Sequence, residues 1–114
     1  FIYIEDVCDA IYRIIQRGII GETYHISTNK IISIRKLVET ICLMTSINFS
    51  DLVKISNERR GKDHAYLLNT SKLRKKLRWR DQTSLEEGLK KTLNWVDKKL
   101  NYLKKISAEY KHKV

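Results

Sequence analysis

The stretch "ERRGKDHAYLLNTSKLRKKLRWR", residues 58–80, joins two arginines beside a glycine to a short basic segment with helical spacing. Leu73 and Leu77 lie four residues apart, so they share one face of a predicted helix while the basic side chains occupy the other. Trp79, directly after this helix, is typical of a residue that anchors a helix in a core. The stretch is therefore either a nucleic-acid-binding surface or an anion-binding loop followed by an ordinary helix with a solvated basic face.

The basic charge of the chain is concentrated in its second half. The net charge is +10, but residues 1–58 hold 6 Lys/Arg against 7 Asp/Glu, whereas residues 59–114 hold 17 against 6. Such asymmetry indicates either a polyanionic partner or a surface that faces anionic ligands. Trp79 and its basic neighbours could contact bases and phosphates. No recognised nucleic-acid-binding motif is present, so we do not expect a nucleic-acid partner, and a basic nucleic-acid-binding module stays the alternative.

Composition excludes several classes of protein. With 42% apolar and 32% charged residues, and neither a membrane-length apolar run nor a signal peptide, the chain is expected to be soluble, cytoplasmic and without membrane contact. Cys8 and Cys42 fall on predicted apolar helix faces, so we expect both thiols to be reduced and buried. The three histidines are scattered singly, which argues against a metal site. Because the chain opens with Phe1 in a segment that already reads as structured, we interpret it as a fragment.

Apolar periodicity predicts four amphipathic helices and a few short strands. The helices are expected from Glu5 or Asp6 to about Arg17, from Ser33 along the stripe Ile34, Leu37, Val38, Ile41 and Cys42, from Thr70 or Ser71 over "KLRKKL", and from Ser84 along the stripe Leu85, Leu89, Leu93, Val96, Leu100 and Leu103. Glu87, three residues after Ser84, completes a capping box. Residues 22–27 and 53–56 alternate like short strands, and residues 65–69 read as an extended segment. Isolated strands do not form a stable sheet, so we expect them to extend a sheet that lies elsewhere.

Four segments, in order, resemble one family. From Arg59 to Trp79 the chain reads R-R-G-K-D-H-A-Y-L-L-N-T-S-K-L-R-K-K-L-R-W, which is similar to R-P-G-H-D-x-x-Y-x-x-D-x-S-K-x-x-x-x-L-G-W of extended short-chain dehydrogenases/reductases. "FIYIEDVCDAI" resembles "FIHVDDVARAI", "GETYHIS" resembles "GEVYNIG", and "SLEEGLKKTLNWV" resembles "SFEEGLRKTVEWY". Each segment is weak alone, but together they identify the chain as similar to the C-terminal part of NAD-dependent nucleotide-sugar epimerases and dehydratases of the dTDP-glucose 4,6-dehydratase type.

This resemblance implies a function for the whole chain. Residues 1–114 would be the mainly helical, C-terminal substrate-binding portion of an α/β enzyme whose N-terminal NAD-binding Rossmann domain is absent. The implied partners are a nucleoside-diphosphate sugar, that Rossmann domain and, in the full-length parent, a second copy in a homodimer. The arginine–glycine segment and residues 22–27 favour a 4,6-dehydratase, a lyase of nucleotide-sugar metabolism and polysaccharide biosynthesis. A nucleotide-sugar epimerase of the same family is the alternative.

The resemblance also implies three substrate-binding residues. Arg59 occupies the position that grips the diphosphate, and its planar fork suits phosphate oxygens, unless it is simply a surface arginine in a turn. Lys62 stands where relatives carry His or Asp near the ribose; Lys cannot accept a hydrogen bond, so it could reach phosphate instead. His25 stands where relatives have a phosphate-contacting Asn, and a neutral His can still donate one hydrogen bond. The alternative for His25 is a strand histidine satisfied by its neighbours.

Four other positions are interpreted as structural. Glu5 and Asp6 would cap the first helix, and Tyr66, like Trp79, would pack rather than bind ligand. Arg78 replaces the glycine that relatives carry before the tryptophan, which suggests a different helix ending.

The catalytic residues of the family are missing from this sequence. Its catalysis needs a Tyr-x-x-x-Lys pair, but the residues four places after the six tyrosines are Val7, Gln16, Thr28, Thr70, Ile106 and Val114. Four scattered glycines cannot form the Gly-x-x-Gly-x-x-Gly turn that seats a dinucleotide. The chain is therefore expected neither to catalyse nor to bind a cofactor by itself, whereas the parent would use NAD(P).

Overall fold

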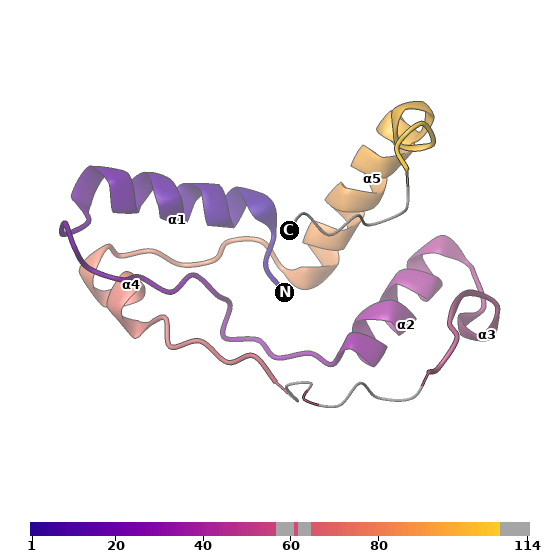
Figure 1. Cartoon of the computed structure of the whole chain (residues 1–114), viewed down its shortest axis with the longest axis horizontal. Helices are drawn as coiled ribbons and strands as arrows, with labels where there is room; N and C mark the ends of the chain where they lie inside the picture. Colours follow the sequence, from indigo (N-terminus) through magenta and orange to yellow (C-terminus); the bar gives the residue numbers. More distant parts are fainter. Residues whose placement is uncertain (57–60, 62–64, 108–114) are drawn as a thin grey trace.

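A computed structural model of the chain describes residues 1–56, 61 and 65–107. Within these residues the chain forms five helices, which Figure 1 shows joined by long connections. They are α1 (Ile4–Arg17), α2 (Ile34–Thr45), α3 (Phe49–Leu52), α4 (Ser71–Lys76) and α5 (Leu85–Leu103). The four predicted helices are all present, and the single-turn α3 was not predicted.

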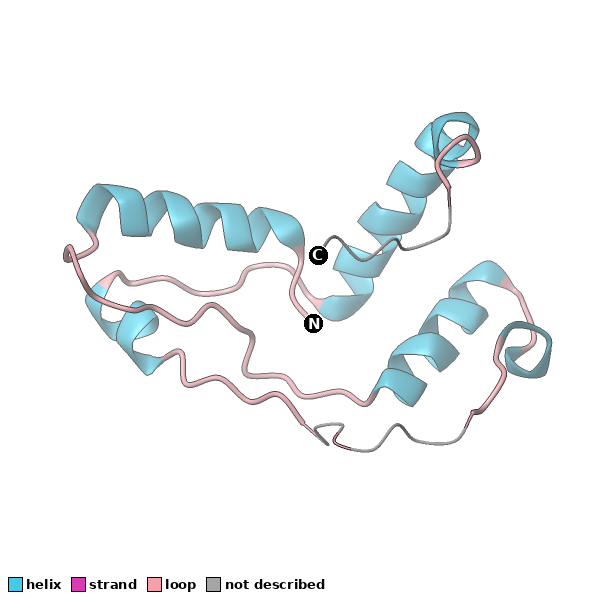
Figure 2. Ribbon diagram, in the orientation of Figure 1, coloured by secondary structure: helices cyan, strands magenta, loops and turns pink. Residues whose placement is uncertain are grey.

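The predicted short strands are wrong for the part of the chain that the structure describes. Residues 22–27 and 53–56 run as loops, as Figure 2 shows, and no strand occurs among the described residues. The alternation in these segments was real, but a strand exists only when a neighbouring strand pairs with its backbone. The described part of the fold is thus mainly helical.

The hydrophobic core is small and forms where α1 meets α4. Ala10, Leu73, Leu77 and Trp79 are its buried members, and Ile2, Ile14, Tyr24 and Ile26 pack against them. The predictions that Leu73 and Leu77 form a buried face and that Trp79 anchors it are therefore confirmed. Since Trp79 has no exposed surface, its ring is not accessible for stacking on a base.

The first helix differs from expectation in three respects. It begins at Ile4, and its N-cap residue Tyr3 makes no side-chain capping bond, so neither Glu5 nor Asp6 is the cap. The helical spacing of Val7, Ala10, Ile11, Ile14 and Ile15 predicts one apolar face, but of these residues only Ala10 is buried and Ile15 is 77% exposed. Cys8 is exposed, against the expectation of two buried thiols, while Cys42 on α2 is buried as predicted.

Two predicted caps are confirmed and one is replaced. The Ser33 hydroxyl accepts a hydrogen bond from the Lys36 amide and the Ser84 hydroxyl accepts one from the Glu87 amide, each at 3.1 Å. At α4 the Asn69 side chain accepts from the Ser71 amide at 3.0 Å instead of a Thr70 or Ser71 hydroxyl.

Two further side-chain expectations also change. Tyr66 is 82% exposed, so it is not a packing residue in this structure. Arg78 has a φ of 51°, the left-handed conformation that glycine commonly supplies after a helix. The expectation of a different helix ending is therefore wrong, because Arg78 adopts the glycine-type ending itself.

The chain is more expanded than a self-contained domain of its size. Its radius of gyration is 17.3 Å, compared with about 13 Å expected for a compact domain of this length. Large apolar side chains stand in solvent, among them Ile15, Ile20 and Leu43. Among the described residues, no helix is both long and apolar enough to span a bilayer.

Candidate functional site

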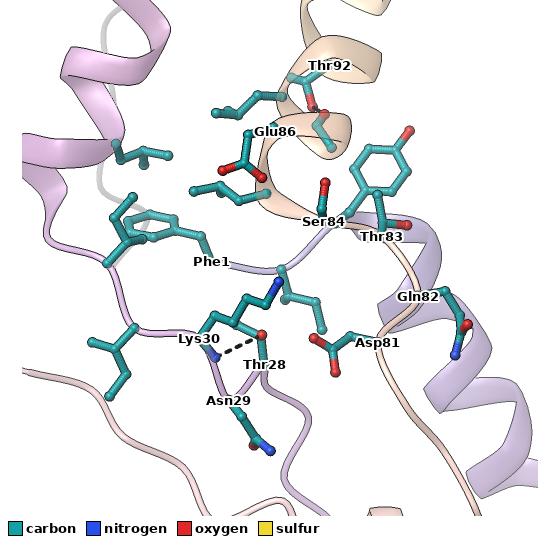
Figure 3. Close-up of a pocket in the computed structure, with 18 residues that line it drawn as sticks. Phe1, Thr28, Asn29, Lys30, Asp81, Gln82, Thr83, Ser84, Glu86 and Thr92 are labelled. Carbon is teal, nitrogen blue, oxygen red and sulfur yellow. Dashed lines mark hydrogen bonds between the residues drawn. The ribbon is translucent and has the colours of Figure 1, made fainter.

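A pocket of about 670 Å³ opens where the N-terminal segment meets the start of α5 (Figure 3). Its walls are residues 1–3, 28–32 and 81–86, with Leu37, Gly88, Leu89 and Thr92 completing the lining. Phe1, Leu37 and Leu89 make one part apolar, whereas Thr28, Lys30, Asp81 and Ser84 contribute polar groups. A concave site with an apolar body and a few convergent polar groups is typical of small-ligand binding.

Asp6 holds the loop that forms one wall of this pocket. Its two carboxylate oxygens accept hydrogen bonds from the backbone amides of Gln82 at 3.1 Å and Thr83 at 3.0 Å. Its backbone carbonyl accepts a third bond, from the Trp79 indole at 3.2 Å. Asp6 is 6% exposed, and hydrogen bonds to a shielded carboxylate are among the stronger ones in proteins. The start of α1 thus fixes the loop that leads into α5.

An ion pair also holds the wall that contains Asp81. Arg74 donates to Asp81 at 2.7 Å, and both side chains are about four-fifths buried. Burial raises the pKa of Asp81, but the hydrogen bonds from Arg74 and Thr28 outweigh it, so the pKa lies below its usual value of 3.8. Asp81 is consequently a paired carboxylate at neutral pH and is not poised to act as a general acid.

The base of the pocket depends on a close approach between Tyr3 and α5. Gly88 is buried inside α5, and a Cβ atom at this position would lie 3.2 Å from the Tyr3 Cβ. Lys91, one turn on, lies 5.1 Å from the centre of the Tyr3 ring and pairs with Glu87 at 3.2 Å. The hydrogen bond that Lys91 donates to Glu87 raises the pKa of Lys91, so this lysine stays charged. Glycine in mid-helix is therefore explained by packing.

A hydrogen bond fixes part of the polar lining of the pocket. The Lys30 amide donates to the Thr28 hydroxyl at 3.1 Å (dashed in Figure 3), which fixes the turn that carries both residues. Lys30 supplies the cation of the lining, and its acids are Asp81 and Glu86. Across the described ranges, no group of three or more His, Cys, Asp or Glu could hold a metal ion. Among the described residues, the lining contains neither a histidine nor a cysteine.

The three predicted substrate-binding residues do not line this pocket. Arg59 and Lys62 lie outside the described residues, so their predicted roles stay predictions. His25 is described; it is exposed and is not among the lining residues.

None of the lining residues was predicted from the sequence to bind a ligand. Ser84 had been identified only as a helix cap, and Leu37, Leu85 and Leu89 only as members of apolar helix stripes. Thr28 and Asp81 are more than 50 positions apart, so no local pattern could bring them together.

The glycines of this chain do not form the glycine-rich turn that seats a dinucleotide. Its four glycines serve other purposes: Gly18 ends α1, Gly21 and Gly61 adopt positive φ outside the helices, and Gly88 packs on Tyr3. None precedes a helix as a glycine-rich turn that could cradle a pyrophosphate.

Comparisons with known proteins point to one family. Residues 1–92 match the sequence profile described as GDP-mannose 4,6 dehydratase. A trifunctional UDP-glucose 4,6-dehydratase/UDP-4-keto-6-deoxy-D-glucose 3,5-epimerase/UDP-4-keto-L-rhamnose-reductase of Arabidopsis thaliana is 35% identical over 95 residues, which are 83% of this chain and 14% of that protein. The dTDP-glucose 4,6-dehydratase of Neisseria meningitidis is 27% identical over 122 aligned residues, covering 97% of this chain and 34% of that protein.

A solved structure agrees with the sequence comparisons. The crystal structure of dTDP-glucose 4,6-dehydratase from Bacillus anthracis in complex with NAD superposes with a TM-score of 0.77 at 27% identity. The match covers 89% of this chain and 32% of that one. The chain thus spans between 14 and 34% of the length of these relatives. Because the family profile covers most of the sequence and the predicted resemblance agrees with it, the chain belongs to the GDP-mannose 4,6-dehydratase family and is similar to its dTDP-glucose 4,6-dehydratases.

Proposed function

We propose that this chain is the substrate-binding portion of an NAD(P)-dependent nucleotide-sugar 4,6-dehydratase. The observation that carries the proposal is the family match over residues 1–92, because this range includes every wall of the pocket. The relatives named above are dehydratases of UDP-glucose and dTDP-glucose, so a nucleoside-diphosphate sugar is the ligand class to test. Without a Tyr-x-x-x-Lys pair or a dinucleotide turn, the chain contributes binding and not the chemical step.

In this proposal, anion recognition falls to four basic residues of the chain. Arg59 grips the diphosphate with a bidentate fork, and Lys62 adds a cation beside the nucleotide. His25 is exposed, so its imidazole is accessible to donate a hydrogen bond to a phosphate oxygen. Lys30 lines the pocket itself and adds a further positive charge there. Binding energy at the diphosphate would orient a sugar for chemistry performed by other residues.

The remaining partners are a Rossmann domain that holds NAD(P) and a second copy of the parent. Support for a covering domain comes from the exposed apolar side chains on α1 and α2, including Ile11, Ile15 and Leu43. A monomeric domain rarely leaves so many large apolar groups in water. The α/β class and the homodimer belong to the parent and stay predictions.

Two alternatives differ in what supports them. A family epimerase would use the same diphosphate site, and the Arabidopsis relative carries an epimerase activity in its name. A nucleic-acid-binding module would rely on the exposed Lys75, Lys76, Arg78 and Arg80. It is disfavoured because Trp79 is buried and Arg74 is committed to internal hydrogen bonds.

Calorimetric titration of the full-length natural protein with dTDP-glucose, UDP-glucose and GDP-mannose tests this proposal. We expect one of these ligands to bind in a saturable manner and to be dehydrated when NAD is supplied. Turnover with retention of the sugar's oxygen and inversion at one carbon would favour the epimerase. Absence of binding and turnover with all three, together with tight, salt-dependent binding of DNA, would contradict the proposal in favour of the basic module.

A further inference from the structure

Arg74 does not line the pocket, yet its side chain contacts both polar walls. Its Nη2 atom donates to the Asp81 carboxylate at 2.7 Å and to the Ser27 carbonyl at 3.2 Å. Asp81 lines the pocket, and Ser27 directly precedes the lining segment 28–32. One guanidinium nitrogen therefore connects two loops that are far apart in the sequence.

The remaining contacts of Arg74 immobilise the guanidinium. Its Nε atom donates to the Thr70 hydroxyl at 2.9 Å, and that hydroxyl lies 3.4 Å from the side-chain oxygen of Asn29, another lining residue. The guanidinium carbon lies 5.1 Å from the centre of the buried Trp79 ring. Thr70 and Trp79 are both buried. The Arg74 guanidinium therefore contacts the core on one side and the pocket loops on the other.

We propose that Arg74 is a positioning residue for the pocket, which holds the loops 27–32 and 79–83 at the separation that a bound ligand requires. The ligand class rests on the proposed function, but the positioning role is a claim about this chain alone. The family pattern leaves position 74 unspecified, so the inference comes from the contacts and not from the resemblance. The lowered pKa of Asp81 agrees with it, because Arg74 stabilises the charged carboxylate.

The geometry requires arginine and not merely a positive charge. A planar guanidinium presents Nε and Nη2 in fixed directions, which is how it reaches Thr70, Ser27 and Asp81 together. A lysine has one nitrogen and could keep the pair with Asp81 while losing another contact. Arg74→Lys should therefore retain part of the positioning effect, and Arg74→Met should retain none.

Hydrogen–deuterium exchange on the full-length protein tests the positioning role without any ligand. In Arg74→Met we expect amides in 27–32 and 81–84 to exchange about tenfold faster than in wild type, and in Arg74→Lys by a smaller factor. Lys76→Met is the matched control, because Lys76 is an exposed cation on the same helix. Ala10→Gly is the second control: it destabilises α1, whose Asp6 holds residues 82 and 83, but it removes no bond to residues 27–32. In Lys76→Met both pocket loops should exchange at the wild-type rate, and in Ala10→Gly residues 27–32 should not exchange selectively faster than the rest of the chain.

Calorimetry with dTDP-glucose, UDP-glucose and GDP-mannose on the same variants adds the functional arm. If the pocket walls are misplaced in Arg74→Met, its affinity for the ligand that wild type binds should fall by about tenfold. The affinity of Arg74→Lys should fall by less, and that of the two controls should not fall. Unchanged loop exchange in Arg74→Met would overturn the inference, and so would loss of affinity equal to that of Ala10→Gly. If wild type binds none of the three ligands, the proposed function is wrong, and the exchange arm alone still decides whether Arg74 positions the loops.

Discussion

Removing the Asp6 carboxylate should destabilise the protein far more than removing a neighbouring surface carboxylate. Asp6→Ala eliminates the two bonds to the Gln82 and Thr83 amides, and a hydrogen bond to a charged group contributes about 1.5–3 kcal/mol. Gln82 is exposed, so water can partly replace its lost partner. We therefore expect a loss of about 2–4 kcal/mol, and roughly half of this for Asp6→Asn, which keeps one acceptor oxygen.

Urea unfolding followed by Trp79 fluorescence measures this loss directly. Trp79 is fully buried and donates to the Asp6 carbonyl, and a Trp95→Phe background leaves it as the single tryptophan within residues 1–114. Asp9→Ala is the matched control, because the Asp9 carboxylate is 42% exposed and pairs only with Arg13 among the described residues. Such exposed pairs contribute about 0.2–1 kcal/mol. Equal losses for Asp6→Ala and Asp9→Ala would refute the claim that Asp6 fixes the pocket loop.

Three further predictions follow from single features of the chain. Arg78→Gly should stabilise the protein by about 1 kcal/mol in thermal unfolding, because glycine adopts the left-handed backbone conformation of this position without steric strain. The hydrogen bond from Arg13 to the carbonyl of residue 78 is kept, and a lower melting temperature would contradict this prediction. The pKa of Asp81 is lower in the folded state, so its pair with Arg74 stabilises the fold above about pH 4, and this stabilisation is lost as the pH falls through the folded pKa. The difference in unfolding free energy between wild type and Arg74→Met should therefore shrink below about pH 4. A difference that stays constant down to about pH 2 would show that the pair is not its source. In the full-length protein Arg59→Ala should weaken binding of the sugar nucleotide by about ten- to a hundredfold, and Arg60→Ala by much less, since the family pattern has Pro at that position. Equal effects would show that the alignment through "ERRGKD" is displaced.

The local features of the fold were predictable from the sequence. Ser33 and Ser84 were identified as caps because a capping serine and the amide three residues later are neighbours in every helix. Leu73 and Leu77 were identified as a buried face because helical spacing fixes which residues share a side. These relations depend only on the backbone geometry of a few consecutive residues.

The pocket could not be predicted, because its contacts are not local. Asp6 was interpreted as a cap, but its partners are 76 and 77 residues away, a distance that no periodicity encodes. Arg74 was counted among solvated cations, although its carboxylate partner lies seven residues on, across a helix ending. The predicted strands failed for a related reason, because alternation describes a segment and pairing needs a partner. Burial of charged side chains depends on tertiary contacts of this kind.

The central claim is that this chain contacts the nucleotide-sugar ligand, and photo-crosslinking tests it most directly. The sugar nucleotide that binds would be made as an analogue with a photoreactive group near its diphosphate. The full-length protein would be irradiated with this analogue, and the crosslinked peptides would be identified by mass spectrometry. The account predicts labelled peptides from residues 28–32, 59–62 or 81–86, with labelling suppressed by excess unmodified ligand. Competable labelling confined to peptides outside residues 1–114 would contradict it.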